Sequence, residues 1–431
     1  MKRQAKTVAA RGDTIINLVG LIACLLSLLI LLVAGSAVAE DQSAARSVAM
    51  GGAYIGLAKG PDAAKFNPAN LGLTDFRRNG MEIVGVGLNV SNNAFTLSDY
   101  NKYTGAFLTD QDKQDILDKI PSDGLRLNVD ARATAMSVAR GNYAFTLSGV
   151  GVADVNMSKD LMDLVLNGNT FADTIDVTGS YSDAYSYAAA GVSYGMPIYS
   201  VGSRQLAVGA TFKYITGFAV EEVVELEGMA ATFATGFQGE GHLIARTATG
   251  GKGYAMDIGA SLQIDPSLTV GARVENLLGS ITWSNETEEH GYVFSFDTMT
   301  VDNMDEDYVT SDDYTRSIGS FSTRLPAVLT VGGAKSFGKL IVAVDWQQGL
   351  SHKPGISTEP LIHAGLEWSP LRFLPLRAGF KAGGDRNTGF SAGSGLDLKL
   401  FYLDFAVVTG TSISGYSTKG LNVALATGLR F

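Results

Sequence analysis

The feature that most constrains this chain is a repeated alternation of apolar residues with small or polar ones. At the C-terminal end, Leu, Val, Thr and Phe occupy the odd positions from Leu421 to Phe431, and Asn, Ala, Gly and Arg fill the even positions. Because successive strand residues point to opposite faces, this segment predicts a strand with one apolar face. The same alternation recurs in segments that begin at Met81, Leu206, Met256, Leu268, Leu340, Ile362 and Leu376.

The number and length of these segments predict a closed barrel. Further strands are expected at 125–139, 143–155, 176–196, 327–334 and, as a pair, within 390–408, which brings the total to about 14. The segments that begin at Met81, Leu206, Met256, Leu268, Leu340, Ile362 and Leu376 have roughly the 9–11 residues with which a tilted strand crosses a bilayer. The predicted fold is therefore all-β: a single transmembrane antiparallel up-and-down β-barrel of about 14 strands with no free edge in lipid. A large soluble sandwich or propeller is the alternative, but Gly, Arg, Glu and Lys on the second face favour a wet lumen.

The composition agrees with strands that face lipid. Hydrophobic residues make up 46% of the chain and charged residues only 18%, yet beyond the N-terminal region no stretch approaches the length of an apolar membrane helix. The net charge of −10 disfavours nucleic acid as a partner. No pair among the four histidines has metal-ligand spacing, so we expect neither a metal site on histidines nor a cofactor.

The start of the chain has the pattern of a secretory signal peptide. Four basic residues precede an apolar stretch at 18–33, and Ala37-Val38-Ala39 follows it as a small-x-small site. Residues 1–39 are therefore predicted to be removed on export. Two alternatives are an uncleaved anchor helix and a lipoprotein box that ends at Cys24, although the apolar residues after Cys24 disfavour lipidation.

Three long loops are expected in the barrel region, residues 81–431, near 99–124, 156–176 and 284–322. The first two contain short amphipathic helices at 110–120 and 160–166. The third includes ten acidic residues and no Lys or Arg between positions 285 and 313. Asp302, Asp305 and Asp307 could hold Ca²⁺ there, but their spacing is not that of an EF-hand, and a solvated acidic loop is the simpler interpretation.

Between the leader and the first strand, residues 40–80 are rich in glycine and contain a tight turn at Asn67-Pro68. An Asn side chain before proline readily bonds the nearby backbone, which predicts a compact knot of chain. A compact segment that precedes a barrel suggests a plug in its lumen.

Three short motifs in this segment resemble the long-chain fatty-acid transporter (FadL-like) superfamily of outer-membrane barrels, including its PorV-like and TraF-like relatives. They are M-G-G-A at 50–53, D-A-A at 62–64 and N-P-A-x-L at 67–71. A second similarity is the stretch 274–283, V-E-N-L-L-G-S-I-T-W. The resemblance implies an outer-membrane location in a Gram-negative-type bacterium, with lipid and the barrel-assembly machinery as partners. It assigns Asn67, Pro68 and Ala69 to a hatch, and Leu429 and Phe431 to the assembly signal.

The resemblance also implies passage of hydrophobic small molecules through an apolar pocket and sideways through the barrel wall. Tyr181, Tyr185 and Tyr187 share one strand face and are candidates to line that pocket. The alternative is that they form an ordinary aromatic girdle, as Trp283, Trp346 and Trp368 are expected to do. A different function, suggested by the PorV-like and TraF-like similarity and the acidic loop, is a docking or scaffold component of a secretion or cell-surface system.

No enzymatic activity is expected. Residues 389–393 match G-x-S-x-G, but a nucleophile elbow needs a strand-to-helix turn and a later histidine. All four histidines precede Ser391, and the following residues are predicted to form a strand. The motif is therefore interpreted as a hairpin turn.

Overall fold

The computed structural model describes residues 41–431, except for 77, 169–173, 234–235, 300–308, 352–355, 385–387 and 411–417. The predicted signal peptide, residues 1–39, lies outside the described residues. In the described part of the chain, no helix is both long enough and apolar enough to cross a membrane.

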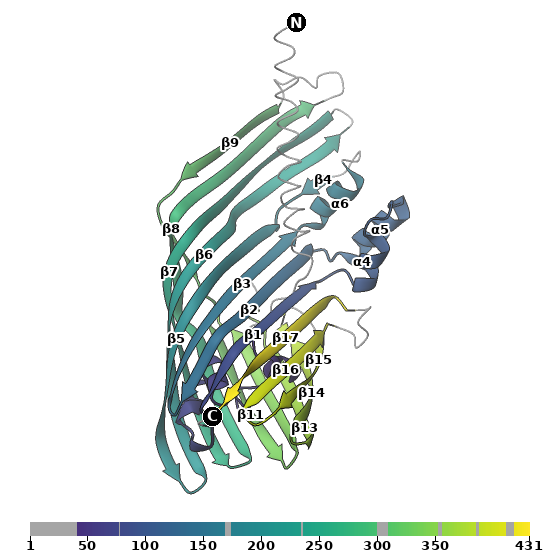
Figure 1. The fold of residues 1–431 in the computed structure, drawn as a ribbon. Helices are drawn as coiled ribbons and strands as arrows, with labels where there is room; N and C mark the ends of the chain where they lie inside the picture. Colours follow the sequence, from purple (N-terminus) through teal and green to yellow (C-terminus); the bar gives the residue numbers. More distant parts are fainter. Residues whose placement is uncertain are drawn as a thin grey trace.

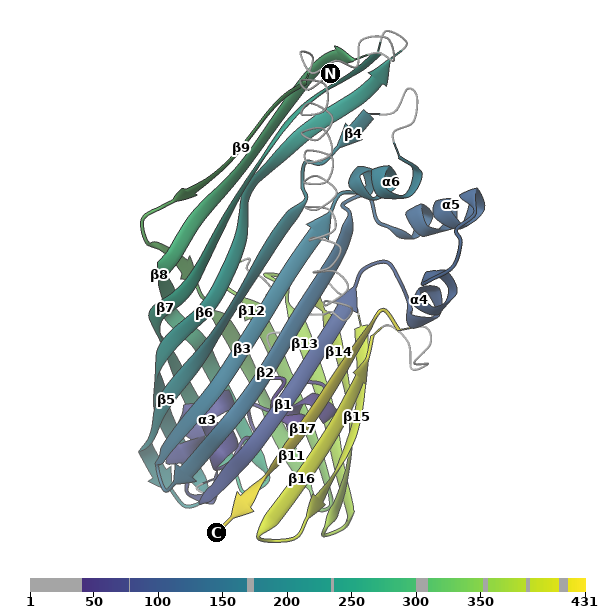
Figure 2. The ribbon, with the colours of Figure 1, turned by 45° about the horizontal axis from the view of Figure 1, so that its top comes forward.

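Fourteen strands form a closed antiparallel barrel (Figures 1 and 2). In order around the wall they are β1 (Gly80–Asn92), β2 (Leu125–Arg140), β3 (Tyr143–Met157), β5 (Tyr181–Val201), β6 (Arg204–Phe233), β7 (Gly236–Asp265), β8 (Leu268–Met299), β11 (Val328–Phe337), β12 (Leu340–Gly349), β13 (Leu361–Leu371), β14 (Leu374–Gly383), β15 (Thr388–Asp397), β16 (Phe401–Thr409) and β17 (Gly420–Arg430). Strand β17 closes the ring by pairing with β1, from Met81 opposite Leu429 to Val90 opposite Leu421. The predicted barrel of 14 strands is confirmed.

Apolar side chains project from the outer face of the wall, as an apolar band in lipid requires. Examples from four strands are Val86, Leu88, Leu366, Trp368, Phe405, Leu425 and Leu429, all of which are exposed. Trp368 thus lies on the outer face, where a girdle residue is expected. The inner face carries small and polar residues, most of them buried.

The two ends of the barrel differ. At one end the strands are joined by short turns such as Gly141-Asn142, and the C-terminus lies there too (Figure 1). The other end carries α4 (Leu97–Tyr103), α5 (Asp110–Lys119), α6 (Lys159–Asn167) and the short strand β4 (Thr174–Asp176). Short turns face the periplasm in outer-membrane barrels, which orients the molecule. Helices α5 and α6 confirm the two predicted helices, and each begins at a hydroxyl N-cap, Thr109 or Ser158.

Strands β6, β7 and β8 have 30, 30 and 32 residues, far more than a bilayer requires, and they rise beyond the rest of the wall (Figure 1). The expected loop at 284–322 is therefore wrong in part. Strand β8 continues to Met299, and β9 (Val309–Ser317) and β10 (Phe321–Arg324) both pair with it. The many acidic residues of this segment favoured a loop over a strand in the sequence. However, residues 291–296 include Tyr, Val and Phe, which favour strands, and this run pairs with β7.

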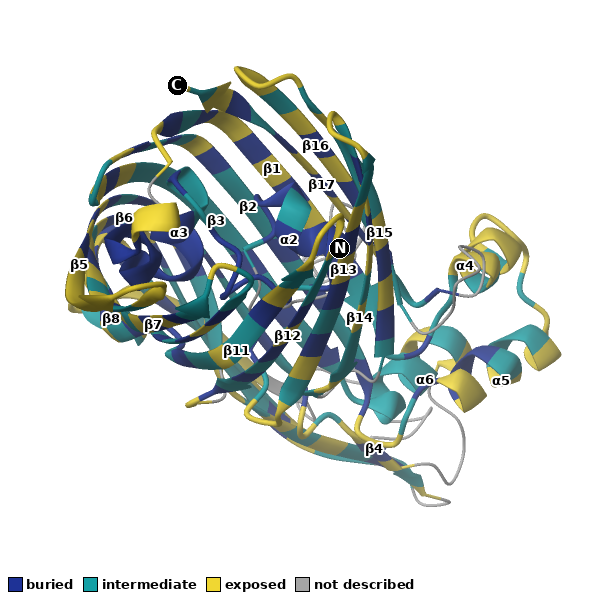
Figure 3. Ribbon diagram, turned by 90° about the horizontal axis from the view of Figure 1, so that it is seen from below, coloured by how far each residue is buried: buried dark blue, intermediate teal, exposed yellow. Residues whose placement is uncertain are grey.

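The N-terminal segment folds inside the lumen near the periplasmic end. We call residues 41–76 the plug; it contains α2 (Ala45–Ala49), α3 (Pro61–Phe66) and the 3₁₀ turns η1 (Pro68–Gly72) and η2 (Thr74–Phe76). Viewed from the periplasmic side, α2 and α3 lie within the ring of strands and are largely buried (Figure 3). Helix α2 packs Ala45, Val48 and Ala49 against alanines of β16 and β17.

Candidate functional site: the plug and the lumen

Glycines on the inner face of the wall let the plug backbone approach closely. We call eight of them the glycine belt: Gly85, Gly87, Gly195, Gly209, Gly259, Gly365, Gly379 and Gly393. A Cβ built at each would lie closer than 3.0 Å to an atom of the plug. In the sequence, small residues on the inner face were interpreted as the mark of a wet lumen. Around the plug, these small residues instead form the surface on which the plug packs.

The three residues assigned to the hatch lie in this contact. Asn67 is fully buried, and its Nδ2 donates to Ser261 Oγ (2.9 Å) and to the carbonyl of Ala260 (3.1 Å) on β7. Its Oδ1 accepts from the N–H of Ala69 (3.1 Å), which caps η1. Pro68 and Ala69 pack on Gly209. The motif thus joins a tight turn of the plug to the wall, while its role as a hatch stays a prediction.

Replacing Asn67 by alanine is expected to loosen the plug. The substitution removes three hydrogen bonds and leaves the buried hydroxyl of Ser261 short of a donor, a loss of about 1–3 kcal/mol in the free energy of unfolding. Urea unfolding in lipid vesicles measures it. The matched control is Asn167→Ala, whose exposed side chain donates to Asp163 within α6; equal losses in both variants would contradict the account.

Buried charges also tie the plug to the wall. Lys65 Nζ donates to both carboxylate oxygens of Glu82 on β1, at 2.9 Å each. Burial by itself would lower the pKa of Lys65, but Glu82 and Asp62 outweigh burial and hold that pKa above its ordinary value. Arg46 forms a bidentate pair with Glu367 on β13, at 2.8 and 2.9 Å. These pairs fix the plug at two points of the ring.

An apolar cluster lines the lumen on the extracellular side of the plug. Its members are Val152, Tyr185, Tyr187, Ala189, Ile215, Val220, Ala248, Ala255, Ile281, Trp283 and Leu325. The rings of Tyr185 and Tyr187 stack with their centroids 6.1 Å apart. Tyr181 lies outside this cluster, half-buried at the start of β5, and donates to Asp154 Oδ1 (3.3 Å). The structure therefore brings together two of the three candidate tyrosines.

Trp283 was assigned to the girdle, and this is wrong. It is fully buried inside the lumen, where its ring lies against Gly217 and Gly251 of the neighbouring strands. Its Nε1 donates to Thr323 Oγ1 (2.9 Å). Only the strand register, which places Gly217, Gly251 and Trp283 side by side, could have revealed this position.

Two small cavities lie beside the tyrosines, and one of them also contacts the plug. One, of about 70 Å³, is lined by charged and polar residues that include Asp41, Lys65, Arg132, Lys213, Asp257 and Glu275, with Tyr187 beside them. The other, of about 20 Å³, lies against Tyr185 and Asn276. A benzene-sized guest occupies a cavity of about 150 Å³. A lipophilic molecule can therefore enter only if the plug or these side chains move.

The wall is irregular beside this cluster. Asn276 and Leu278 of β8 have positive φ angles of 52° and 57°, which non-glycine residues rarely adopt. Opposite them β10 ends and β11 begins, so that the β8 ladder is interrupted between Ser280 and Glu275. Two hydrogen bonds bridge the gap, from the N–H of Leu325 to Gly279 O (2.9 Å) and from Asn276 Nδ2 to Pro326 O (3.3 Å). Asn276 lines the smaller cavity, whereas Leu278 is 87% exposed.

Other predicted features have simpler surroundings. Ser391 lies within strand β15, not in the expected hairpin turn, and donates to the carbonyl of Ala49 (3.0 Å). Leu429 and Phe431 are exposed at the end of β17, and their role in assembly stays a prediction. Asp302, Asp305 and Asp307, the candidate Ca²⁺ ligands, lie outside the described residues.

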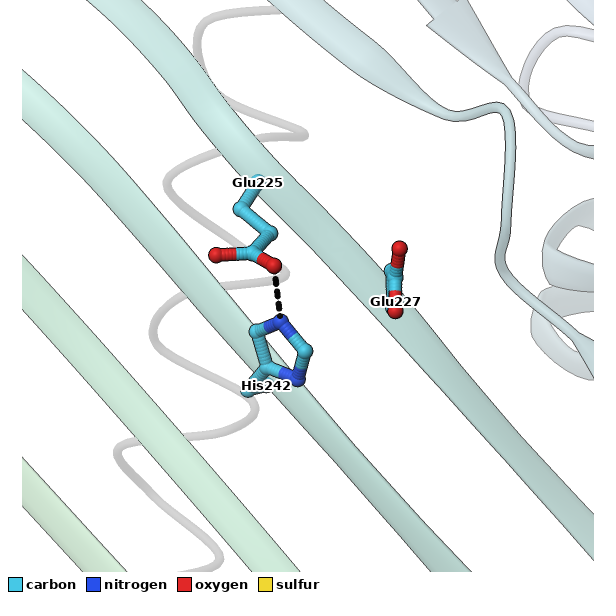
Figure 4. A group of neighbouring side chains, drawn as sticks. All are labelled: Glu225, Glu227 and His242. Atoms are coloured by element: carbon cyan, nitrogen blue, oxygen red, sulfur yellow. Dashed lines mark ion pairs between the residues drawn. The ribbon is translucent and has the colours of Figure 1, made fainter.

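We call the ends of β6, β7 and β8 that rise beyond the rest of the wall, together with β9, the extracellular arm. One group of side chains on this arm has the composition of a metal site. Glu225 and Glu227 share a face of β6, and His242 lies opposite on β7, with ligand atoms within 4.8 Å of one another (Figure 4). His242 Nε2 lies 2.9 Å from Glu225 Oε1, so an ion pair or hydrogen bond already accounts for the contact. Both glutamates are exposed.

Comparison with known proteins gives one family and one fold. A model described as a family of unknown function (DUF5723) matches residues 78–236 and 222–406. No curated protein matches the chain. Among solved structures, the toluene transporter TbuX of Ralstonia pickettii has a TM-score of 0.51 at 17% identity, covering 89% of this chain and 97% of that one. The P. putida toluene transporter TodX has a TM-score of 0.50 at 13% identity, covering 93% and 99%.

A FadL homologue of Pseudomonas aeruginosa also has a TM-score of 0.50, at 12% identity, and covers 92% of this chain and 100% of that one. At such identities these similarities establish the fold. The match to the family model spans most of the chain, from the end of the plug through β16. The chain therefore belongs to the family of unknown function DUF5723 and has the 14-stranded fold of FadL-like outer-membrane barrels.

Proposed function

We infer that this barrel passes hydrophobic small molecules across the outer membrane, with the plug as its gate. The observation that carries the proposal is the apolar cluster around Tyr185, Tyr187 and Trp283, which lies beside the interrupted ladder of β8. Two barrels of the same fold are described as toluene transporters, which supports a lipophilic substrate. Residues 1–39 would direct export as a cleaved signal peptide.

The physical logic requires an apolar route. A lipophilic solute gains about 25 cal/mol for each Å² of apolar surface removed from water, which a water-filled pore cannot supply. The cluster would hold the solute, and the interruption near Asn276 offers a lateral exit because only two hydrogen bonds bridge the wall there. Tyr185 and Tyr187 are the candidate ligand-lining residues on this route, and Tyr181 would lie nearer its extracellular entrance.

Uptake by proteoliposomes tests the proposal. We expect the protein to accelerate entry of radiolabelled toluene, and Tyr187→Ala to slow it about tenfold because the solute loses aromatic contacts. The matched control is Tyr143→Ala, since Tyr143 is 62% exposed on the outer wall and its ring contacts that of Tyr194 at a tilt, outside the lumen. Uptake no faster than in protein-free liposomes would contradict the proposal.

The extracellular arm favours a second candidate, a docking or scaffold role in a secretion or cell-surface system. Strands β6, β7, β8 and β9 present an ordered surface well beyond the bilayer, with Glu225 and Glu227 exposed on it. If this candidate is correct, a defined surface or secretion protein is captured by the barrel, and deletion of 285–313 abolishes capture without changing uptake. If the deletion variant still captured the partner protein, this part of the arm would be excluded as the docking surface.

A further inference from the structure

The periplasmic mouth of the lumen contains a third cavity, larger than the two beside the tyrosines. It has a volume of about 380 Å³ and lies below the plug. Its walls are the plug around Leu57–Asp62, the linker Arg78–Gly80 and periplasmic turns that include Pro266 and Arg372. We call it the periplasmic basin. It is large enough for a small molecule, unlike the two cavities on the other side of the plug.

The lining of the basin has more basic than acidic side chains. Six basic residues line it, Arg46, Lys59, Arg78, Arg372, Arg377 and Arg430, against four acidic ones, Asp62, Glu367, Asp397 and Asp404. All four carboxylates already pair with a cation. Glu367 binds Arg46 and Arg377, Asp404 binds Arg377, Asp397 binds Arg430, and Asp62 lies 3.4 Å from Lys65.

Lys59, Arg78 and Arg372 are left without a carboxylate within 4.0 Å among the described residues. Lys59 Nζ instead lies over the ring of Phe76, 4.1 Å from its centroid. Burial, together with the positive charges of Arg78 and Arg46, lowers the pKa of Lys59 to about 8, and Asp75 opposes the shift. Burial and the charge of Arg430 likewise lower the pKa of Arg78. The basin thus holds mutually repelling cations in a chain of net charge −10.

We propose that the periplasmic basin binds the oxyanion of a small molecule, a carboxylate or a phosphate group, through Lys59 and Arg78. The planar guanidinium of Arg78 can donate two parallel hydrogen bonds to such a group, and Lys59 adds a point charge. Leu57 and Phe76 give the basin an apolar side that accepts a short chain. The site lies on the periplasmic side of the plug, and its existence does not depend on passage through the lumen.

Binding to the purified full-length barrel, measured by calorimetry in detergent, tests the proposal. The probes are hexanoate, inorganic phosphate and hexanol, which keeps the chain of hexanoate but has no charge. We expect at least one anion to bind and hexanol to bind more weakly than hexanoate. Tighter binding of hexanoate identifies the head group of an amphiphile as the ligand, and tighter binding of phosphate identifies a free phosphate or its ester.

Two variants locate the site. Arg78→Gln and Lys59→Met are each expected to weaken anion binding about tenfold, the effect of losing one charge-assisted contact. Their controls are Arg204→Gln, at the start of β6, and Lys399→Met, in the turn before β16; both are exposed cations at the periplasmic end and lie outside the basin lining. A heat-dependent shift in gel mobility confirms that each variant is a folded barrel. Equal weakening by the controls would overturn the proposal, as would absence of binding by both anions.

The pH dependence gives an independent result. The charges of Arg78, Arg46 and Asp75 act on Lys59, whose pKa is lowered to about 8, so its proton leaves as the pH rises through that value. Anion affinity of the unmodified chain should therefore fall between about pH 7 and 9.5, whereas Lys59→Met should show a flatter profile. If the unmodified chain and Lys59→Met showed the same pH dependence of anion affinity, Lys59 would not contribute to the site. None of these results depends on toluene uptake, so the failure of either proposal leaves the other open to its own test.

Discussion

Replacing Gly379 by valine is expected to unseat the plug and open the lumen to ions. Gly379 belongs to the glycine belt on β14, and a Cβ there would lie closer than 3.0 Å to backbone atoms of Met50 and Gly51. Overpacking of a core usually costs about 1–3 kcal/mol, and more where backbone cannot yield. Because the clash is with plug backbone, no side-chain rotation can relieve it, and we expect the plug to move away from the wall.

Conductance of single barrels in planar bilayers measures this effect. We expect the unmodified protein to conduct poorly and Gly379→Val to conduct steadily, with the plug open to protease. The matched control is Gly151→Val on β3, where an added Cβ meets no atom within 4 Å and valine favours the strand. If the two variants conduct alike, the glycine belt does not seat the plug.

Lys65→Met is expected to cost about 3–5 kcal/mol in the free energy of unfolding. The side chains of Lys65 and Glu82 are 4% and 1% exposed, so the substitution leaves a carboxylate buried in the wall without its cation. Asp62, which lies 3.4 Å from Lys65 Nζ, loses the same cation. The penalty comes from the stranded charges, not from loss of the methylene stem, which methionine retains.

The double variant Lys65→Met/Glu82→Gln separates these causes. Removing the second charge should recover part of the loss, so that the double variant unfolds at higher urea than Lys65→Met alone. Lys102→Met serves as a control because the side chain of Lys102 is 53% exposed and pairs with Asp112, Asp115 and the hydroxyl of Tyr103 at the surface, so its loss should change unfolding little. If the double variant were less stable than Lys65→Met, the buried unpaired charge of Glu82 would not be the cause of the loss.

The barrel could be predicted because the alternation of apolar with small or polar residues is local to each strand and repeats along the chain. Alternation along each strand specifies which face meets lipid, and a sheet in lipid must close, so strand number and the β1–β17 pairing followed. The arm formed by the end of β8 was missed because its acidic residues resemble a loop. Those acids are tolerated in strands because this part of the wall rises beyond the bilayer, where both faces can be polar.

The site was less predictable because it depends on register and on contacts between distant segments. The Asn67-Pro68-Ala69 motif indicated a turn, but not that glycines of the surrounding strands accept its backbone. Tyr185 and Tyr187 were found because they share a strand face, whereas Trp283 joins them only through pairing of β6, β7 and β8. The basin cations Lys59, Arg78 and Arg372 come from three separate segments, and no local pattern marks them.

Toluene uptake with the plug locked to the wall tests the central claim, passage through the lumen gated by the plug. Ser43 Oγ of the plug lies 2.7 Å from Thr134 Oγ1 of β2, so cysteines at both positions can form a disulfide. Ser43 also lines the cavity beside Tyr187. Because the single cysteine of the chain, Cys24, lies in the segment proposed to be cleaved, the two introduced cysteines can pair only with each other, and we predict slow uptake by oxidised Ser43→Cys/Thr134→Cys proteoliposomes and recovery on reduction. Equal uptake by the oxidised and reduced proteoliposomes would contradict gating by the plug. No uptake in the reduced state would contradict passage of toluene through the lumen.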